Sequence, residues 1–347
     1  MKLIVTGGAG FIGSNFIRYW LTRYPQDKIL NLDVLTYAGN LPSLDDVVKK
    51  HARNYQFVKG DIIDFETMDE VVKSFQPDVI VNFAAESHNS WAVINPTVFF
   101  KTNVMGTQNL LEVCRKNQVP RFHHISTCEV YGDLPLGGKR KFRETSPFRP
   151  RTPYNASKAA SDLAVRAYYE TFKLPVTISN CSNNYGPYQF PEKLISLFVT
   201  NLLDNQKVTL YRSSQNRREW LHVTDHCRAI DLILKKGKIG ETYNIGSGVE
   251  KSVEEITTII LSKLGKPASM KTYIKDRLGL DHRYLLDSSK IRKKLGWRPE
   301  MSFKEGIRKT ICWYQENRAW WEPLKKRLSL PESYWKKGSK NKKRKKQ

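Results

Sequence analysis

The sequence lacks the features of disulfide-rich, zinc-binding and membrane-spanning proteins. Its five cysteines are scattered without paired spacing, at Cys114, Cys128, Cys181, Cys227 and Cys312. Scattered cysteines argue against a disulfide framework and a zinc site. No apolar run is long enough to cross a bilayer, and the N-terminal residues read as a short strand with a glycine turn, not a signal peptide. We therefore expect a cytoplasmic globular protein without a metal site.

Acidic residues are scarce relative to basic ones. Asp and Glu number 34 against 58 Lys and Arg, which gives a net charge of +24. Residues 336–347 hold eight of these cations and no acid, so we expect a disordered basic tail. A solubilising role for the tail is favoured over contact with nucleic acid, which stays open. Without the tail the net charge is still +16, which suits an anionic substrate such as a nucleotide sugar.

A glycine-rich turn near the N-terminus predicts a dinucleotide site. The strand-like Leu3-Ile4-Val5 precedes Thr6-Gly7-Gly8-Ala9-Gly10-Phe11-Ile12-Gly13, and a helical pattern follows. In this context the glycines let the backbone approach a pyrophosphate at a helix N-terminus. The next strand ends in Asp33, 20 residues after Gly13, where an acid holds the adenosine ribose hydroxyls. Because an acid there repels a 2′-phosphate, we expect NAD as the cofactor.

Further apolar strands, at 55–58, 79–83, 122–126 and 176–179, alternate with helical segments. This pattern predicts an α/β fold, a Rossmann-type doubly wound parallel sheet with a smaller C-terminal α/β substrate domain. We place the NAD-binding domain at 1–180 and the nucleotide-sugar domain at 181–335, with some segments returning to the first. Asp61 follows the third strand, where adenine contact and a helix cap are both open. For Asn103 two roles are open: it either braces the backbone of the active site or has a surface or packing role.

Two short motifs suggest acid–base chemistry. Ser126-Thr127-Cys128-Glu129-Val130-Tyr131-Gly132 follows a strand, and Thr152-Pro153-Tyr154-Asn155-Ala156-Ser157-Lys158 opens a helix, because Pro153 suits a first turn. Tyr154 and Lys158 are four residues apart, so they share a helical face. We expect the lysine ammonium to lower the phenol pKa from about 10. Such a phenol can remove a proton from a sugar hydroxyl near neutral pH.

Together these motifs resemble the extended short-chain dehydrogenase/reductases, and within them the dTDP-glucose 4,6-dehydratase family, over roughly residues 1–325. The more specific matches are LTYAGNL (35–41), AAESH (84–88), NCSNNYGPYQFPEKLI (180–195), REWLHVTDH (218–226) and YNIG (243–246). The resemblance implies an NAD-dependent hydro-lyase that converts dTDP-glucose to dTDP-4-keto-6-deoxyglucose and water. It also implies a homodimer, with the helix at roughly 154–172 contributing to the contact.

The resemblance also implies residue roles. Tyr154, with Lys158 and Thr127, would take the 4-hydroxyl proton, Glu129 would remove the proton on the fifth carbon, and Cys128 stands at the position of the general acid. The cofactor would contact Gly7, Gly10, Phe11, Ile12, Gly13, Asp33, Asp61, Ile62, Ala84, Ala85, Tyr154 and Lys158. The substrate would contact Ser87, Thr127, Asn184, Glu192, Lys193, Arg218, Asn244 and Arg277; Arg218 and Arg277 also suit phosphate as guanidinium forks.

Three departures from the family pattern bear on the substrate. Cys128 replaces the usual Asp, which predicts slower elimination because a thiol is the weaker acid. Asn89-Ser90-Trp91-Ala92 replaces Val-Asp-Arg-Ser, and Leu280 replaces a His. The alternatives are another NAD-dependent nucleotide-sugar enzyme (a UDP-sugar dehydratase, decarboxylase or epimerase) and a weakly active or non-catalytic NAD-binding relative.

Overall fold

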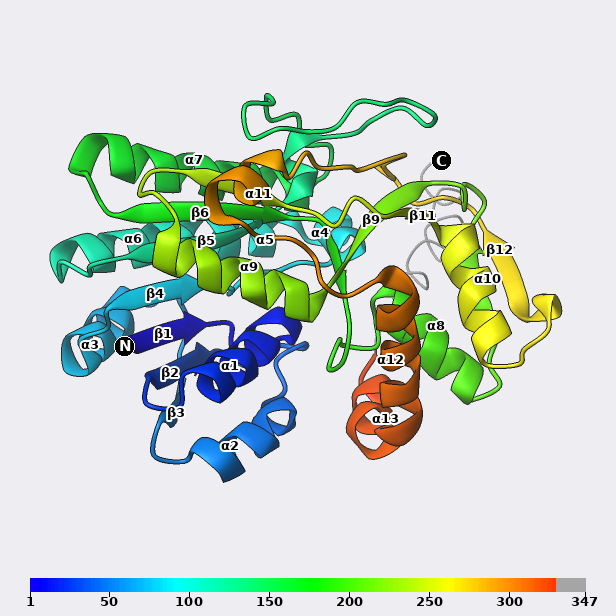
Figure 1. Ribbon diagram of the computed structural model, residues 1–347, viewed down its shortest axis with the longest axis horizontal. Coiled ribbons are helices and arrows are strands. Elements are labelled where there is room, and N and C mark those ends of the chain that lie inside the picture. The colour runs from blue at the N-terminus through cyan, green and yellow to red at the C-terminus, as the bar shows by residue number, and fades with distance from the viewer. Residues whose placement is uncertain (329–347) are drawn as a thin grey trace, which may run out of the picture.

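The protein is built around one parallel β-sheet (Figure 1). The structure, a computed structural model, describes residues 1–328, so the predicted tail at 336–347 lies outside the described residues. Seven strands lie in the order β10-β6-β5-β4-β1-β2-β3, and neighbouring strands pair in parallel. They are β1 (Lys2–Thr6), β2 (Lys28–Asp33), β3 (Tyr55–Lys59), β4 (Val79–Asn82), β5 (Phe122–Thr127), β6 (Val176–Cys181) and β10 (Thr242–Ile245). The predicted doubly wound sheet is confirmed.

Helices cover both faces of the sheet (Figure 1). On one face lie α3 (Phe65–Phe75), α6 (Thr107–Lys116) and α7 (Pro153–Phe172), whose Met68, Leu110 and Val165 enter a core with Ile4 and Ile80. On the other face lie α1 (Phe11–Arg23), α2 (Asp45–His51) and α9 (Val223–Lys236). Burial on both sides explains why strands such as β4 read as continuous apolar runs.

The strand order reverses beside β1, because β2 and β3 extend to one side of it and β4, β5 and β6 to the other. Ligands of such sheets bind outside the carboxyl ends of the strands at this switch point. Short elements surround that edge: the 3-10 helices η1 (Leu41–Leu44) and η3 (Cys128–Tyr131), α4 (Asn89–Ile94), α5 (Pro96–Phe99) and the π-helix η2 (Phe100–Gly106). The residues predicted to bind the ligands and to take part in the reaction therefore lie around this switch point.

The second half of the chain forms a smaller α/β unit around its own core. Its helices are α8 (Leu194–Leu203), α10 (Val253–Lys263), α12 (Phe303–Glu316) and α13 (Arg318–Lys326), with α11 (Ser289–Leu295) and the 3-10 helix η4 (Ala268–Met270). Its strands are β7 (Asn183–Tyr185), β8 (Val208–Tyr211), β9 (Arg217–His222), β11 (Glu250–Ser252) and β12 (Lys271–Ile274). Trp220 and Trp321 fill its apolar core.

The two halves are interleaved in sequence. Strand β10 pairs with β6 in the main sheet, and Ile230 of α9 packs in the same cluster as Phe16 of α1. Segments beyond residue 180 thus return to the first half, and the predicted division at 180 stays a prediction. Among residues 1–328, no helix has the length and apolar character needed to span a bilayer.

Candidate active site

The glycine turn after β1 is closely packed. Gly7 has φ +69°, and a Cβ added there would lie 2.5 Å from the backbone N of Ala84. A Cβ on Gly13 would lie 2.4 Å from the carbonyl oxygen of Gly7. Gly7 therefore requires glycine because L side chains rarely adopt its φ, and both positions require it because a Cβ would strike neighbouring backbone atoms. The turn leads into α1, whose N-cap is Gly10, so helix-end amides face the carboxyl edge of the sheet.

Asp33 lies beside this turn. Its carboxylate accepts hydrogen bonds from Ala9 N (3.0 Å) and Leu35 N (2.8 Å), and burial raises its pKa above the usual range. Each carboxylate oxygen has a second lone pair for a hydroxyl donor. A glycine cradle next to a strand-end carboxylate fits the pyrophosphate and ribose of NAD.

Other predicted cofactor residues line the same region. Asp61 accepts a hydrogen bond from Ile63 N (3.1 Å). The N-cap of the following helix α3 is Asp64, so the helix-cap alternative for Asp61 is wrong, while its contact with adenine stays a prediction. Ile62 is 3% exposed and belongs to the core. Ala84 and Ala85 follow β4, and Phe11 and Ile12 begin α1 with their side chains packed on its core cluster.

Tyr154 lies near the N-terminus of α7, opposite the end of β5. Thr152 caps this helix by accepting from Asn155 N, and Pro153 is in the first turn as predicted. The Thr127 side chain lies beside the Tyr154 phenol. Burial, followed by the negative charge of Glu129, raises the pKa of Tyr154 well above its ordinary value.

The prediction that Lys158 lowers the pKa of Tyr154 is wrong for this structure. The Lys158 ammonium lies against β5, where Nζ donates to Ile125 O at 2.8 Å and contacts His124 Nε2 at 3.2 Å. Burial lowers the pKa of Lys158 to about 8, opposed by the negative charge of Asp162. Helical spacing placed both residues on one face, but the long lysine side chain is satisfied elsewhere.

Glu129 sits within a group of polar residues. Asn89 Nδ2 donates to Glu129 Oε2 at 2.8 Å. Burial raises the pKa of Glu129, and so does the nearby charge of Asp281, while Asn89, Arg218 and Arg277 oppose the rise. A carboxylate in such a setting suits a base whose pKa must approach the working pH.

The Cys128 thiol is buried in an apolar cluster with Val130, Leu134, Phe142 and Leu285, among others. Only 1% of Cys128 is exposed. Burial, with the charge of Glu129, raises the pKa of the thiol well above its ordinary value. The thiol is therefore protonated at neutral pH, as predicted, but it is an even weaker acid than the sequence suggested.

A second polar group faces the same edge from α4 and the segment before α8. Tyr37 Oη donates to Glu192 at 3.0 Å, and Lys193 Nζ donates to the carbonyl oxygen of Ser87 at 3.0 Å. His88 Nε2 lies 3.9 Å from Glu192. Tyr154 is among the residues that affect the pKa of Tyr37, so this group lies near Tyr154.

Three other predicted substrate residues each contact another group of the protein. Arg218 lies over the ring of Tyr284, 4.7 Å from its centroid, and donates to Asp281 O, while Arg277 donates to Leu278 O. Asn184 pairs with His226 at 3.0 Å.

Asn244 does not join the site. It is 0% exposed, accepts from Tyr131 Oη at 2.9 Å and donates to Phe142 O at 3.1 Å. The expectation that Asn244 contacts the substrate disagrees with this geometry, because both ends of its amide already bind the protein.

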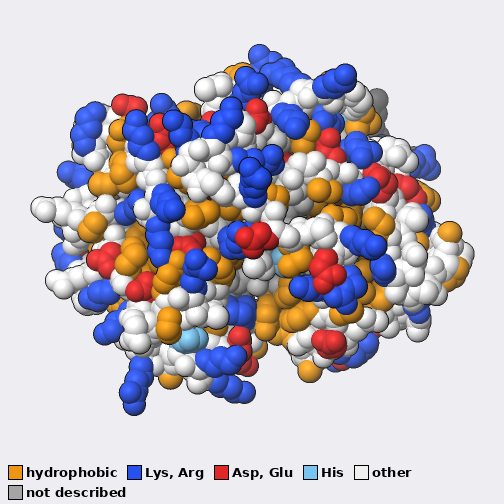
Figure 2. Space-filling model, in the orientation of Figure 1, with side chains coloured by type: hydrophobic (Ala, Val, Ile, Leu, Met, Phe, Trp, Pro, Cys, Tyr) orange, Lys and Arg blue, Asp and Glu red, His pale blue; other side chains and the backbone are white. Residues whose placement is uncertain are grey.

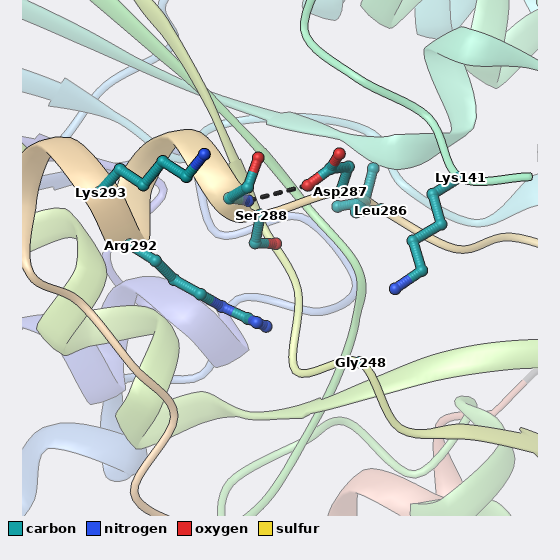
Figure 3. Close-up of a pocket in the computed structure, with 8 residues that line it drawn as sticks. Lys141, Gly248, Leu286, Asp287, Ser288, Arg292 and Lys293 are labelled. Atoms are coloured by element: carbon teal, nitrogen blue, oxygen red, sulfur yellow. Dashed lines mark hydrogen bonds between the residues drawn. The ribbon is translucent and has the colours of Figure 1, made fainter.

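A cavity of about 150 Å³ lies elsewhere, next to α11. The side chains of Lys141 and Arg292 point into it from opposite sides, and none of the predicted site residues lines it (Figure 3). On the face shown in Figure 2, Lys and Arg are spread widely with acids among them. The cavity is thus part of a generally basic surface and separate from the Tyr154 region.

Sequence reasoning missed two residues beside Glu129. Asn89 stood in a stretch noted only for departing from the family pattern. Asp281 is 0% exposed, and Tyr284 donates to its carboxylate. Burial raises the pKa of Asp281. No local pattern in the sequence marks either residue, because Asn89 meets Glu129 across 40 positions and Asp281 meets Arg218 across 63.

Comparison with known proteins identifies the relatives of this chain. A family model described as GDP-mannose 4,6 dehydratase matches residues 4–310. The dTDP-glucose 4,6-dehydratase of Streptomyces niveus is 48% identical, with 94% of this chain and 96% of that protein covered. The chain belongs to the dTDP-glucose 4,6-dehydratase family. The enzyme of that name from Neisseria meningitidis is 46% identical, with 92% and 95% covered.

Solved structures agree with this family assignment. The dTDP-glucose 4,6-dehydratase from Streptomyces venezuelae, solved with NAD bound, is 49% identical and has a TM-score of 0.90, with 93% of this chain and 100% of that chain covered. A UDP-glucose 4-epimerase from Thermotoga maritima is 27% identical with a TM-score of 0.84, covering 92% and 100%. The fold is thus shared with epimerases, whereas the higher identity is with the dehydratases.

Proposed function

We propose that this chain is an NAD-dependent hydro-lyase that converts dTDP-glucose to dTDP-4-keto-6-deoxyglucose and water. The observation that carries the proposal is that the Tyr154 phenol, with the Thr127 side chain beside it, and the partly buried Glu129 carboxylate lie together at the carboxyl edge of the sheet. An oxidation at one sugar carbon and a proton abstraction at the next need these two groups side by side. The relatives named above support the nucleotide and the sugar.

The residues that would hold NAD are those of the cradle, Gly7, Gly10, Gly13 and Asp33. NAD held there would supply the acceptor for a hydride from the sugar and the donor for its return. Tyr154 accepts the proton of the 4-hydroxyl, and Thr127 holds the phenol in place. Because burial disfavours the phenolate, only the small fraction of Tyr154 that has already released its own proton to solvent can act as the base, and the proton of the 4-hydroxyl then restores the phenol.

The next steps require a base and an acid. The 4-ketone acidifies the proton on the fifth carbon, and Glu129 removes it. Cys128 stays the predicted donor to the departing 6-hydroxyl, and its raised pKa makes this donation slower than that of a carboxylic acid. Arg218, Arg277, Lys193 and Asn184 are the proposed contacts of the nucleotide and its diphosphate.

Product analysis tests the proposal. Purified protein is incubated separately with dTDP-glucose, UDP-glucose and UDP-glucuronate, and products are measured by mass spectrometry, with the Tyr154→Phe variant as control. We expect the loss of one water from dTDP-glucose without consumption of added NAD. Water loss from UDP-glucose alone would mean that the substrate carries UDP and not dTDP. Loss of carbon dioxide from UDP-glucuronate would mean that the protein is a decarboxylase and not a dehydratase. No reaction with any of the three would contradict the proposal.

We also propose a cytoplasmic homodimer. The five cysteines are free thiols, which suits a reducing compartment. Large apolar side chains are exposed on α7 and the adjoining η2, among them Leu163 (58%), Met105 (56%) and Phe100 (42%), and a second copy of the chain would cover them. Light scattering at micromolar concentration should give the dimer mass, and Leu163→Asp should lower it. A monomer mass for the unaltered protein would contradict the dimer.

A further inference from the structure

The contacts of Glu129 include a directed chain of hydrogen bonds that begins at the N-terminus of α7. Asn155 N donates to Thr152 Oγ1 at 3.2 Å. Thr152 Oγ1 donates to Asn89 Oδ1 at 2.7 Å, and Asn89 Nδ2 donates to Glu129 Oε2 at 2.8 Å. Three segments far apart in sequence thus meet in one network.

The polarity of this chain is fixed at each link. The Thr152 hydroxyl has one proton, and because it already accepts from Asn155 N, that proton is directed to Asn89. The carbonyl end of the Asn89 amide is therefore turned to Thr152, and its NH2 end must face Glu129. Thr152 is 4% exposed, so water does not compete freely for the link.

From this geometry we infer that Asn89 is a positioning residue for Glu129, which holds one carboxylate oxygen and favours the ionised form that acts as base. The NH2 group donates to the carboxylate and so favours its charge. The same bond ties Glu129 to the start of the helix that carries Tyr154. The two proton-transfer groups of the proposed reaction are thereby held in one frame.

The groups around Glu129 have opposite effects on its ionisation, and this balance makes the contribution of Asn89 important. The charge of Asp281 and burial favour the protonated acid, while Arg218, Arg277 and Asn89 favour the carboxylate. The arginines bind through long side chains and are themselves engaged with backbone carbonyls. Asn89 contacts Glu129 directly at 2.8 Å and in a fixed orientation, so its removal should alter both the orientation of the Glu129 carboxylate and its charge.

This inference rests on the proposed function, and its test separates the two. The variants are Asn89→Leu, which keeps the size of the side chain without its polar atoms, and Asn89→Asp, which keeps its shape and the bond from Thr152 but adds a negative charge. The control is Asn95→Leu, because Asn95 is exposed at the other end of α4. Oxidation is followed as NADH in a single turnover, and proton abstraction is followed as exchange at the fifth carbon in deuterated water.

In Asn89→Leu we expect oxidation within twofold of the unaltered protein, with exchange at the fifth carbon slowed about tenfold or more, a part of the 10²–10⁴ that a positioned base contributes. The acidic limb of the pH profile should move to higher pH, because removing the donor raises the pKa of Glu129. Asn89→Asp should move that limb at least as far, since a second negative charge lies beside Glu129. Asn95→Leu should change neither.

A purely structural role for Asn89 predicts the opposite order, with Asn89→Asp closer to the unaltered protein than Asn89→Leu. Unchanged exchange and an unchanged acidic limb in both variants would overturn the inference, and Asn89→Asp alone decides it if the leucine variant fails to fold. The pKa of Glu129 is also measurable without turnover, by infrared difference spectroscopy with Glu129→Gln as reference. An inactive unaltered protein with a normal Asn89 effect on that pKa would refute the proposed function and leave the positioning role standing.

Discussion

Replacing Asn103 with leucine should remove the hydrogen bonds that connect the loop after β4 to helix α7. Asn103 lies in the π-helix η2 and is 1% exposed. Its Oδ1 accepts from Glu86 N at 2.9 Å, and its Nδ2 donates to Glu86 O at 3.0 Å and to Ser157 Oγ at 2.8 Å. One amide therefore holds both backbone groups of Glu86 against the helix that carries Tyr154. Irregular helical turns of this kind are frequent at functional sites.

The magnitude follows from the three bonds. Each contributes about 1 kcal/mol net, and the backbone groups of Glu86 left without partners add to the loss. We expect Asn103→Leu to lower the free energy of unfolding by about 3–4 kcal/mol, which for a chain of this size is a fall of roughly 4–6 °C in the midpoint. The rate of oxidation should also fall, about tenfold, because Tyr154 and the loop at Ser87 lose their common support.

Thermal unfolding by circular dichroism and single-turnover NADH formation measure the two effects. Asn109→Leu is the matched control, since Asn109 has the same residue type, lies just beyond η2, and makes one bond, from Nδ2 to Ile62 O at 2.8 Å. The control should lose about a third as much stability and keep its oxidation rate. Equal losses in both variants would refute the reasoning, because the bracing of Glu86 would then have no separate effect.

Three further predictions concern single side chains. Tyr154→Phe should slow oxidation by about 10²–10⁴ with little change in folding, measured as NADH formation; a rate within tenfold of the unaltered protein would exclude Tyr154 as the proton acceptor. Cys128→Asp should speed the loss of water at some cost in stability, about 1–3 kcal/mol for a buried carboxyl, and an unchanged elimination rate would mean that Cys128 is not the acid. Burial raises the pKa of Glu219 to about 7 from 4.5, so its contribution to stability is full below about pH 4.5 and is lost as the pH rises through about 7. The unfolding midpoint of the unaltered protein should therefore fall more between pH 5 and 8 than that of Glu219→Gln, and equal slopes would refute the assignment.

The fold was predictable because its signals are local. The glycines at 7, 10 and 13 and the acid at the end of β2 report on backbone geometry within one βαβ unit, which the structure contains. Apolar strands at regular spacing likewise report on a sheet buried on both faces. What no local pattern could show is that β10, more than 60 residues after β6, completes the same sheet.

The site was predictable in its residue types but not in its electrostatics. Helical spacing placed Tyr154 and Lys158 together, yet the ammonium turns to the carbonyl of Ile125, and burial controls the phenol. Asn244 matched a family motif, but it is buried and its amide is hydrogen-bonded to Tyr131 and Phe142. Such outcomes depend on burial and on partners distant in sequence, which the order of residues does not specify.

In the proposed reaction the hydride removed at the fourth carbon returns to the sixth carbon of the same sugar as water leaves. The direct measurement uses dTDP-glucose labelled with deuterium at the fourth carbon, with the product examined by mass spectrometry and NMR. We expect a product lighter by one water, with the deuterium on its sixth carbon and no net NADH. A product of unchanged mass with deuterium still on the fourth carbon, or deuterium released to added NAD, would contradict it.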